Sequence, residues 1–414
     1  MRPFGQLLGS YTVNDLGDSI GVVALSILVF DRTGDVAPTA GFFLVAKFLP
    51  ALFSTGLTAH LDRMSLRKVL PAIYLLEALV FAGLGFLAIG DRFFLPLILL
   101  LGLVDGTLAI TGRGLTRGAV AATLQPHGLI AEGNALMNLG FAASSVFGAA
   151  IAGGLIAAFG VSAALFVDAA SFLIIAVWLA STRGFPTVAH HTYEPWRTRF
   201  RAGLSFARSN PLIRTLLVGQ SLALICFTVV VPIEVIYAKE SLGATSAGFG
   251  LLLSAWGAGI VLGSLLFLVL KNRSSFGLVI VSSALVGVAY LGMSQAHVLW
   301  LACAMSVIGG AGNGIQWVAV MTALQEATPP EFQSRMSGLL ESIGAAMPGV
   351  GFLLGGVLTV LGSPRTAFAF AGAGILVLAG VALALRPSAE RRAAAAAQTS
   401  TTTGSTIGRR LSRS

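Results

Sequence analysis

The sequence predicts an all-α polytopic membrane protein with twelve transmembrane helices in two six-helix pseudo-repeats. Three observations lead to this prediction: the composition, a series of apolar runs of membrane-spanning length, and a segment that occurs twice. Charged residues make up 10% of the chain and apolar residues 56%, against about 25% and 45–50% in soluble globular proteins. Lipid, rather than water, is therefore the expected surrounding of most of the chain.

Twelve apolar runs have the length of a membrane-spanning helix. About 20 helical residues cross the ~30 Å hydrocarbon layer of a bilayer. The runs lie near residues 11–30, 38–60, 69–90, 93–113, 134–158, 161–181, 213–237, 247–270, 275–294, 298–323, 336–361 and 364–386. The first run contains Asp15 and Asp18 and lacks a small-residue cleavage site, so we expect a retained helix rather than a signal peptide.

The repeated segment indicates an internal duplication. GRGLTRGAVAATLQ at 112–125 returns as GNGIQWVAVMTALQ at 312–325, with the same residue at six of fourteen positions. IAGGLIAAFG at 151–160 likewise corresponds to LLGGVLTVLG at 353–362. Transporters are commonly built from such repeats, with the substrate site at the interface between them.

The duplication and the one long connection divide the chain into four parts. We expect a six-helix half at 1–181, a cytoplasmic linker at 182–212, a second six-helix half at 213–386 and a disordered cytoplasmic tail at 387–414. In the linker, Trp196, Phe200, Leu204 and Phe206 fall close to one helical face among several Arg residues. This pattern favours a basic amphipathic helix on the inner leaflet, and a plain solvated linker is the alternative.

The distribution of basic residues predicts the orientation in the cell (inner) membrane. With the N-terminus inside, four of the 26 Lys and Arg residues fall on outer loops (Arg32, Arg92, Lys239 and Arg365), Lys47 falls in a helix, and the other 21 lie at the cytoplasmic side. Both termini are then cytoplasmic. The net charge of +9 is spread over several loops and the tail rather than one face, so we expect no nucleic-acid partner.

Several other classes of protein are not expected. Cys226 and Cys303 both lie in apolar runs, which argues against a disulfide framework and a metal site. No phosphate-binding loop of the form GxxxxGK[ST] occurs, so an ion gradient is the expected energy source. GGAGNG at 309–314 follows no strand, and its glycines are typical of close contact between membrane helices. We expect no enzyme activity and no cofactor.

Acidic residues inside the predicted helices are the main candidates for proton coupling. An ionisable group in hydrocarbon costs on the order of 3 kcal/mol and normally faces a cavity or a partner. Burial disfavours the ionised form of a carboxyl group, so such groups can take up and release protons. The candidates are Asp18, Asp105, Glu77 and Asp168.

Each of these acids has an alternative, structural interpretation. Asp18 could pair with Arg113 or with a helix end, and Asp105 could hydrogen-bond a neighbouring backbone. For Asp168 a structural role is favoured, because its helix is expected to face lipid or the other half. Glu77 is expected to snorkel or to pair, with Lys47 as a partner for one of the carboxylates.

Arg113 is the most informative difference between the two copies of the repeat, because its counterpart is Asn313. The flanking glycines are present in both copies, whereas the charge is present in the first copy only. Near the inner end of the fourth helix, Arg113 is expected to approach Asp15 or Asp18 and to leave as the halves move apart. The alternative is an arginine that snorkels to the cytoplasmic surface.

Several segments resemble a known family. They are LDRMSLRKVL at 61–70, TRGAVAATLQ at 116–125, GNALMN at 133–138, GAAIAGG at 148–154, FVDAASFL at 166–173 and ATPPEFQSRMSG at 327–338. Over residues 10–386 the chain resembles major facilitator superfamily transporters, in particular the branch of bacterial macrolide-efflux and enterobactin-type siderophore exporters. It departs from the family pattern at Thr58 and Ser65, where glycines are usual, at Leu66, and at Gly148-Ala149, where exporters often carry Gly-Pro.

The resemblance implies a central cavity lined by helices one, four, seven and ten, which favours Asp18 and Asp105 over the other acids. It implies an inner gate formed by Asp62, Arg63 and Arg67, to which we add Arg113. Aromatic and uncharged polar residues of the cavity-lining helices are the candidates for substrate binding: Asn14, Gln220, Phe227, Asn313, Gln316 and Trp317.

The resulting hypothesis is a monomeric secondary transporter that exports a small amphipathic molecule, such as a lipophilic drug, a siderophore or a secondary metabolite, in exchange for protons. Two alternatives stay open at this point. One is an ion-coupled importer of a small solute. The other is a membrane protein without transport activity, such as an assembly or sensory subunit.

Overall fold

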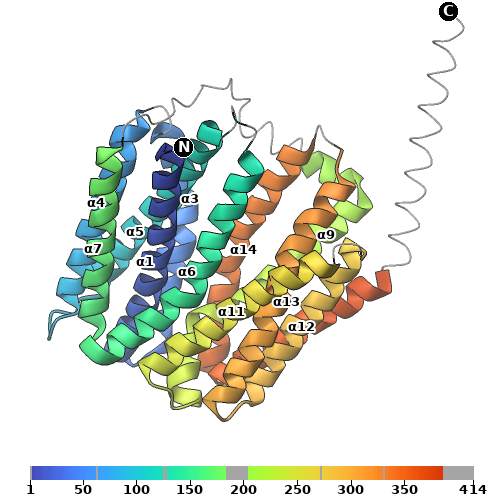
Figure 1. Ribbon diagram of the computed structural model, residues 1–414. Coiled ribbons are helices and arrows are strands. Elements are labelled where there is room, and N and C mark those ends of the chain that lie inside the picture. The colour runs from blue at the N-terminus through green and yellow to red at the C-terminus, as the bar shows by residue number, and fades with distance from the viewer. Residues whose placement is uncertain are drawn as a thin grey trace, which may run out of the picture.

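The computed structural model of the chain is an all-helical bundle (Figure 1). It describes residues 2–61, 64–124, 127, 129–182, 204–270, 273–329 and 332–385, and these contain no strand. The helices of the first half are α1 (Arg2–Thr33), α2 (Val36–Phe43), η1 (Leu44–Phe48), α3 (Leu49–Leu61), α4 (Leu66–Leu87), α5 (Leu95–Leu124), α6 (Ile130–Phe159) and α7 (Val161–Ser181).

The second half begins at α9 (Pro211–Thr228), whose first turn is capped by the Asn210 side chain. After it come η3 (Val231–Ile233), α10 (Glu234–Ile236), η4 (Tyr237–Ser241), α11 (Ser246–Leu270), α12 (Ser275–Gln295), α13 (Leu299–Ala327) and α14 (Gln333–Leu361). A last helix, Pro364–Leu385, follows. Pro232 lies in the break after α9, because proline cannot donate the hydrogen bond that would continue the helix.

The membrane spans agree with the twelve apolar runs. Among the described residues, eleven helices are long and apolar enough to cross a membrane, and each coincides with one of the runs. The remaining run, 134–158, lies within α6, whose described apolar stretch is Val146–Phe159. The predicted fold class, a multi-pass all-α membrane protein, is confirmed.

The expected position of Arg113 near the inner end of its helix is wrong. α5 continues to Leu124, eleven residues beyond Arg113, so Arg113 lies inside the helix rather than near its end. The apolar run ends at Arg113 because polar residues begin there, but the helix itself continues through Thr116 and Arg117. An apolar run records where hydrocarbon contact ends, whereas hydrogen bonding along the helix ends only at its last turn.

The two halves repeat the same packing. α3 packs on α5 as α11 packs on α13, and α4 packs on α5 as α12 packs on α13. α1 packs on α6 as α9 packs on α14. Between the halves, α6 meets α11 and α14 meets α2, which joins the second and fifth spans of one half to the fifth and second of the other. This arrangement agrees with the duplication inferred from the sequence.

Glycines permit the closest helix contacts. A Cβ atom on Gly153 of α6 would lie 3.1 Å from the Cα atoms of Ala247 and Gly250 of α11. In the second half, Gly310 and Gly314 of α13 lie against backbone atoms of α11. The interpretation of GGAGNG as a helix contact is confirmed, and Gly153 belongs to a contact between the halves.

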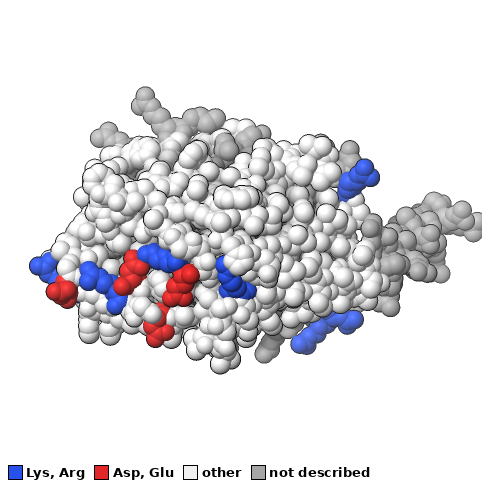
Figure 2. Space-filling view, turned by 90° about the horizontal axis from the view of Figure 1, so that it is seen from below, with Lys and Arg blue, Asp and Glu red and all other residues white. Residues whose placement is uncertain are grey.

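We call the end of the bundle at which α1 begins the amino-terminal face, and the other end the opposite face. Several contacts between the halves lie toward the opposite face: Ala40 against Gly356, the rings of Phe43 and Phe352 at 6.1 Å, and an ion pair between Lys239 and Asp31. Figure 2 shows this face, on which charged side chains of both signs lie mainly in one band.

Only the end of the predicted linker helix falls within the described residues. Residues 204–209 are helical, and Phe206 stacks on Phe332 with ring centroids 4.2 Å apart. This aromatic ring therefore contacts protein, although the sequence predicts contact with the inner leaflet. Trp196 and Phe200, the tail at 387–414, and the gate residues Asp62 and Arg63 lie outside the described residues.

The contact between α6 and α11 predicts a position-specific effect of overpacking. Gly153→Leu should destabilise the protein by roughly 1–3 kcal/mol, because the new side chain meets the backbone of α11. Gly154→Leu is the matched control, since a Cβ atom on the next glycine would have no atom within 4 Å. Thermal unfolding in detergent compares the two variants, and equal loss of stability in both would contradict this account of the contact.

Candidate functional site

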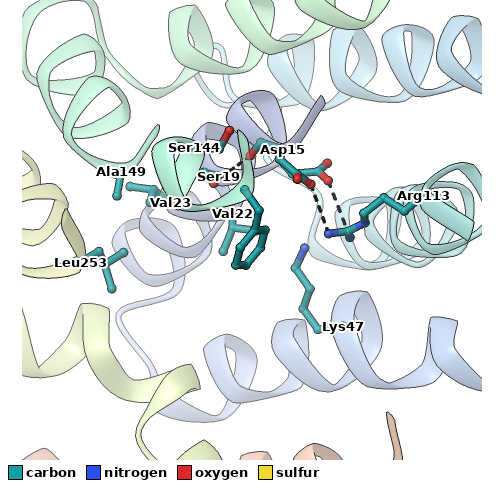
Figure 3. Close-up of a pocket in the computed structure, with 11 residues that line it drawn as sticks. Asp15, Ser19, Val22, Val23, Lys47, Arg113, Ser144, Ala149 and Leu253 are labelled. Atoms are coloured by element: carbon teal, nitrogen blue, oxygen red, sulfur yellow. Dashed lines mark hydrogen bonds and ion pairs between the residues drawn. The ribbon is translucent and has the colours of Figure 1, made fainter. Parts of the chain in front are cut away.

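A cavity of about 270 Å³ lies between the two halves (Figure 3). α1, η1, α5 and α6 supply most of its lining, and α11 of the second half contributes Leu253. The lining residues are Asp15, Asp18, Ser19, Val22, Val23, Lys47, Arg113, Phe141, Ser144, Ala149 and Leu253. Charged groups of both signs thus share one space with apolar side chains.

Arg113 bridges two carboxylates of α1. Its Nη1 lies 3.7 Å from Oδ1 of Asp15, and its Nη2 lies 3.7 Å from Oδ2 of Asp18. Asp15 and Asp18 are three residues apart, so one turn of α1 presents both to the same neighbour. The planar guanidinium group offers separate N–H donors to each acid. The proximity of Arg113 to these acids, expected from the sequence, is present in the structure.

The bridge is held from both sides. The Asn14 amide donates a hydrogen bond of 3.2 Å to Oδ2 of Asp18, and Nε of Arg113 donates one of 3.3 Å to the carbonyl of Ala109. The Asp15 side chain is 3% exposed and that of Asp18 11%, whereas Arg113 is 32% exposed. All three side chains line the cavity, and the cation is the most exposed of them.

Lys47 provides a second cation. It belongs to η1, a π-helical turn between α2 and α3, and Figure 3 shows its ammonium group directed toward the acids and Arg113. Its charge acts on Asp105 of α5. Single π-turns within longer helices are frequent at functional sites, because the extra residue changes the direction of the side chains that follow.

Three further acids are buried among the same helices. Glu77 of α4 and Asp168 of α7 are fully buried, and Asp105 is 5% exposed. In the part of the chain that the structure describes, neither carboxyl oxygen of Glu77 has a hydrogen-bond partner. The expectation that Glu77 snorkels is wrong, because the residue lies in the middle of α4 and its side chain is enclosed by protein.

Asp168 is fixed against α1. The Ser171 hydroxyl donates to its Oδ1 at 3.2 Å, and a Cβ atom on Gly21 would lie 2.7 Å from its Oδ2. Its side chain therefore faces the interior of the first half. The small size of Gly17 and Gly21 gives the carboxyl group this space, which fits the structural role favoured for Asp168.

The acids outnumber the nearby cations. Four carboxyl groups (Asp15, Glu77, Asp105 and Asp168) lie within electrostatic range of Asp18, and the cations near these five acids are Arg113, Lys47 and Arg117. Arg117 also donates a hydrogen bond of 3.1 Å to the Tyr11 hydroxyl. A buried carboxylate without a partner is costly when ionised, so the cluster is suited to holding protons.

The predicted substrate-binding residues do not come together in this cavity. Asn14 does not line the cavity itself but donates a hydrogen bond to Asp18, which does. Gln220 and Gln316 line a second pocket within the second half. Phe227 packs against Trp256 and Tyr290. On α13, Asn313 is half-buried and Trp317 is 45% exposed, and neither lines the cavity.

The gate is described only in part. Arg67 is exposed in the first turn of α4, and no side-chain partner of it is found among the described residues. Its role at a gate stays a prediction.

Three polar or aromatic lining residues are not indicated by the sequence: Ser19, Phe141 and Ser144. Ser144 of α6 donates a hydrogen bond of 3.1 Å to the carbonyl of Thr12 and so ties α6 to α1. A small hydroxyl residue inside an apolar run gives no signal of its own. Asp15 could have been selected, because it lies one helical turn from Asp18.

The bridge predicts a charge-specific loss of stability. Arg113→Leu should destabilise the protein by roughly 1–3 kcal/mol, because Asp15 and Asp18 lose their cation in a largely dry site. Adding Asp18→Asn to this variant should restore part of the loss. Thermal unfolding measures both, with Arg67→Leu as the exposed control, expected within about 0.5 kcal/mol of the wild type. Equal destabilisation of the single and double variants would contradict the bridge.

Known proteins share features of both sequence and fold with this chain. A family model described as Major Facilitator Superfamily matches residues 216–412. No curated protein sequence matches the chain. Many solved structures match its fold, and three transporters serve as examples.

The nucleoside transporter NupG has 13% identity and a TM-score of 0.71, with 93% of this chain and 99% of that chain covered. The POT family transporter PepTSo has 10% identity and a TM-score of 0.72, with 94% and 98% covered. A bacterial homologue of the iron transporter ferroportin, in an inward-facing state, has 17% identity and a TM-score of 0.69, with 92% and 98% covered.

The family and the similar structures are transporters rather than enzymes, as the sequence predicts. The macrolide-efflux and siderophore-export branch stays a prediction. Residues 216–412 match the Major Facilitator Superfamily model, and the described chain has the same fold as these solved transporter structures.

Proposed function

We propose that the protein is a secondary active transporter that exports a small amphipathic molecule in exchange for protons. It works in the cell membrane as a monomer, with both termini cytoplasmic. The observation that carries the proposal is the bridge from Arg113 to Asp15 and Asp18 inside a cavity to which both halves contribute.

Proton uptake acts on this bridge directly. When Asp15 or Asp18 takes up a proton, one of the two negative charges that attract the guanidinium group is removed, and Arg113 is held less tightly. Loss of the proton restores the pairing. The excess of buried acids over cations supports this chemistry, because an acid without a cation is least costly in its neutral form.

The cavity also adjoins the contact between the halves. Ala149 of α6 lines the cavity, and its carbonyl oxygen is the atom that a Cβ on Gly250 of α11 would meet. A substrate or a proton that shifts α6 therefore acts on the helix pair about which the halves move. Alternating access then exposes the cavity to one side of the membrane at a time.

The lining supports an amphipathic substrate. Val22, Val23 and Leu253 offer apolar surface, and Lys47 and Arg113 offer positive charge. A molecule with an apolar body and polar or anionic substituents satisfies both parts. Catecholate siderophores and other secondary metabolites of this chemistry fit the export branch that the sequence resembles, and lipophilic drugs with polar substituents do so as well.

A second candidate function is proton-coupled import of a small zwitterionic solute. The observation that favours it is the presence of both charge signs in the cavity, where Lys47 and Arg113 could hold a carboxylate and an acid could hold an amine. Solved structures with this fold include a nucleoside transporter and a POT family transporter. As an importer, the protein would move the solute and the proton in the same direction.

Everted membrane vesicles with an acid interior test the export proposal. Macrolides, catecholates and lipophilic cations are added in turn, and discharge of the pH gradient is followed by fluorescence quenching. A substrate should discharge the gradient with the wild type, and Asp18→Asn should reduce the initial rate at least tenfold, because the bridge no longer responds to protons at that acid.

Asp91→Asn is the matched control, because Asp91 is exposed on a loop at the opposite face. It should retain the wild-type rate. Two results together would favour the importer. One is uptake of labelled nucleosides or dipeptides into vesicles when the outside medium is the acid side. The other is that no compound of the export panel discharges the pH gradient. Equal rates in Asp18→Asn and the wild type would contradict the role of Asp18.

A further inference from the structure

A second pocket, of about 320 Å³, lies inside the second half. α9, α12, α13 and the helix Pro364–Leu385 line it, and no described residue of the first half takes part. It is therefore separate from the cavity at Arg113. Most of its wall is apolar, formed by residues such as Leu216, Val279, Ile280 and Leu378.

The pocket lies in the half of the bundle nearest the amino-terminal face. Arg214 is three residues after the start of α9 at Pro211, and Gln220 is nine after it, so they lie about 5 Å and 14 Å along the helix. Ser283 is eight residues after the start of α12, about 12 Å along it. The wall thus runs from a cation near the face to amide and hydroxyl groups deeper in the membrane.

The cation has no partner in the described part of the chain. Arg214 is exposed, lines the pocket and forms no ion pair or side-chain hydrogen bond there. A guanidinium group at the edge of an apolar pocket attracts an anionic group and can bind it with two parallel hydrogen bonds.

The deeper polar groups are arranged for a hydrogen-bonding ligand. Gln220 is 7% exposed, lines the pocket and has no hydrogen-bond partner among the described residues. Nε2 of Gln316 donates to the Ser283 hydroxyl at 2.8 Å, which leaves the carbonyl oxygen of Gln316 as an acceptor. Both amides line the pocket and can therefore hydrogen-bond to an occupant with a hydroxyl or carbonyl group at this depth.

We propose that this pocket binds an amphipathic organic acid with a polar group at each end. The acid group pairs with Arg214, the apolar body lies along α9 and the last helix, and a hydroxyl or carbonyl group bonds to Gln220 and Gln316 about 9 Å deeper. A saturated fatty acid or a phospholipid chain fits the apolar wall but leaves the amides unpaired. The proposal concerns binding alone and does not depend on the proposed transport activity.

Binding of three probes tests the proposal: ω-hydroxylaurate, laurate and lauryl alcohol. The protein is placed in nanodiscs of phosphatidylcholine, and saturable binding is measured with labelled probe after subtraction of partitioning into empty nanodiscs. The wild type should bind ω-hydroxylaurate about tenfold more tightly than laurate, which is the factor expected for one well-made hydrogen bond to a buried amide.

The variants separate the two ends of the ligand. Gln220→Leu should bring the affinity for ω-hydroxylaurate down to that for laurate and leave laurate unchanged, and Gln316→Leu should act in the same direction. Arg214→Gln should weaken both acids about tenfold without affecting the alcohol. Gln295→Leu and Arg208→Gln, on exposed residues that do not line the pocket, are the matched controls.

Two results would overturn the proposal. One is the absence of saturable binding of either acid to the wild type. The other is equal affinity for laurate and ω-hydroxylaurate in the wild type and in Gln220→Leu, which would leave a pocket for a lipid chain only. Weaker binding of ω-hydroxylaurate in discs containing phosphatidylglycerol, abolished by Arg214→Gln, would support the anion site and would show that lipid head groups compete for it.

Discussion

The arrangement of the first half depends on the bridge that Arg113 forms with Asp15 and Asp18 inside the membrane-spanning region. Asp15 and Asp18 can be buried next to each other because Arg113 lies between them and Asn14 adds a hydrogen bond. Without the cation, two like charges would share a site of low polarity, which is unfavourable. The position of α5 against α1 is thus set by electrostatics as well as by apolar contact. The cavity exists where these two helices meet α6 and η1.

The two halves share an architecture but differ in chemistry. The first half encloses five acidic side chains between α1, α4, α5 and α7, whereas its counterpart holds an apolar pocket with amides. Asn313 at the position equivalent to Arg113 is the clearest single residue in this difference. Duplication supplied the same helix packing twice, and charge was retained in one copy. Ion handling and ligand contact can then reside in different halves of one molecule.

The spans and the approach of Arg113 to α1 follow from the sequence, because both depend on position along helices. The rotation of each helix about its axis does not follow from it. The sequence leaves Glu77 either to snorkel or to pair and favours the central cavity for Gln220 and Gln316. Each helix has several polar positions, and tertiary packing selects which one faces which space. The π-helical turn at Lys47 has no sequence signal either, because it depends on a local extra residue.

The contact of Gly153 with α11 lies near one end of α6, and this has a mechanical consequence. α6 extends 23 residues from Ile130 to Gly153, so the helix is a lever of about 35 Å with its pivot at the glycine contact. A rotation of roughly 10° about that pivot displaces the far end by about 6 Å on this lever, more than the width of a water molecule. A small tilt where backbone meets backbone is thereby amplified into a displacement of this size at the amino-terminal face.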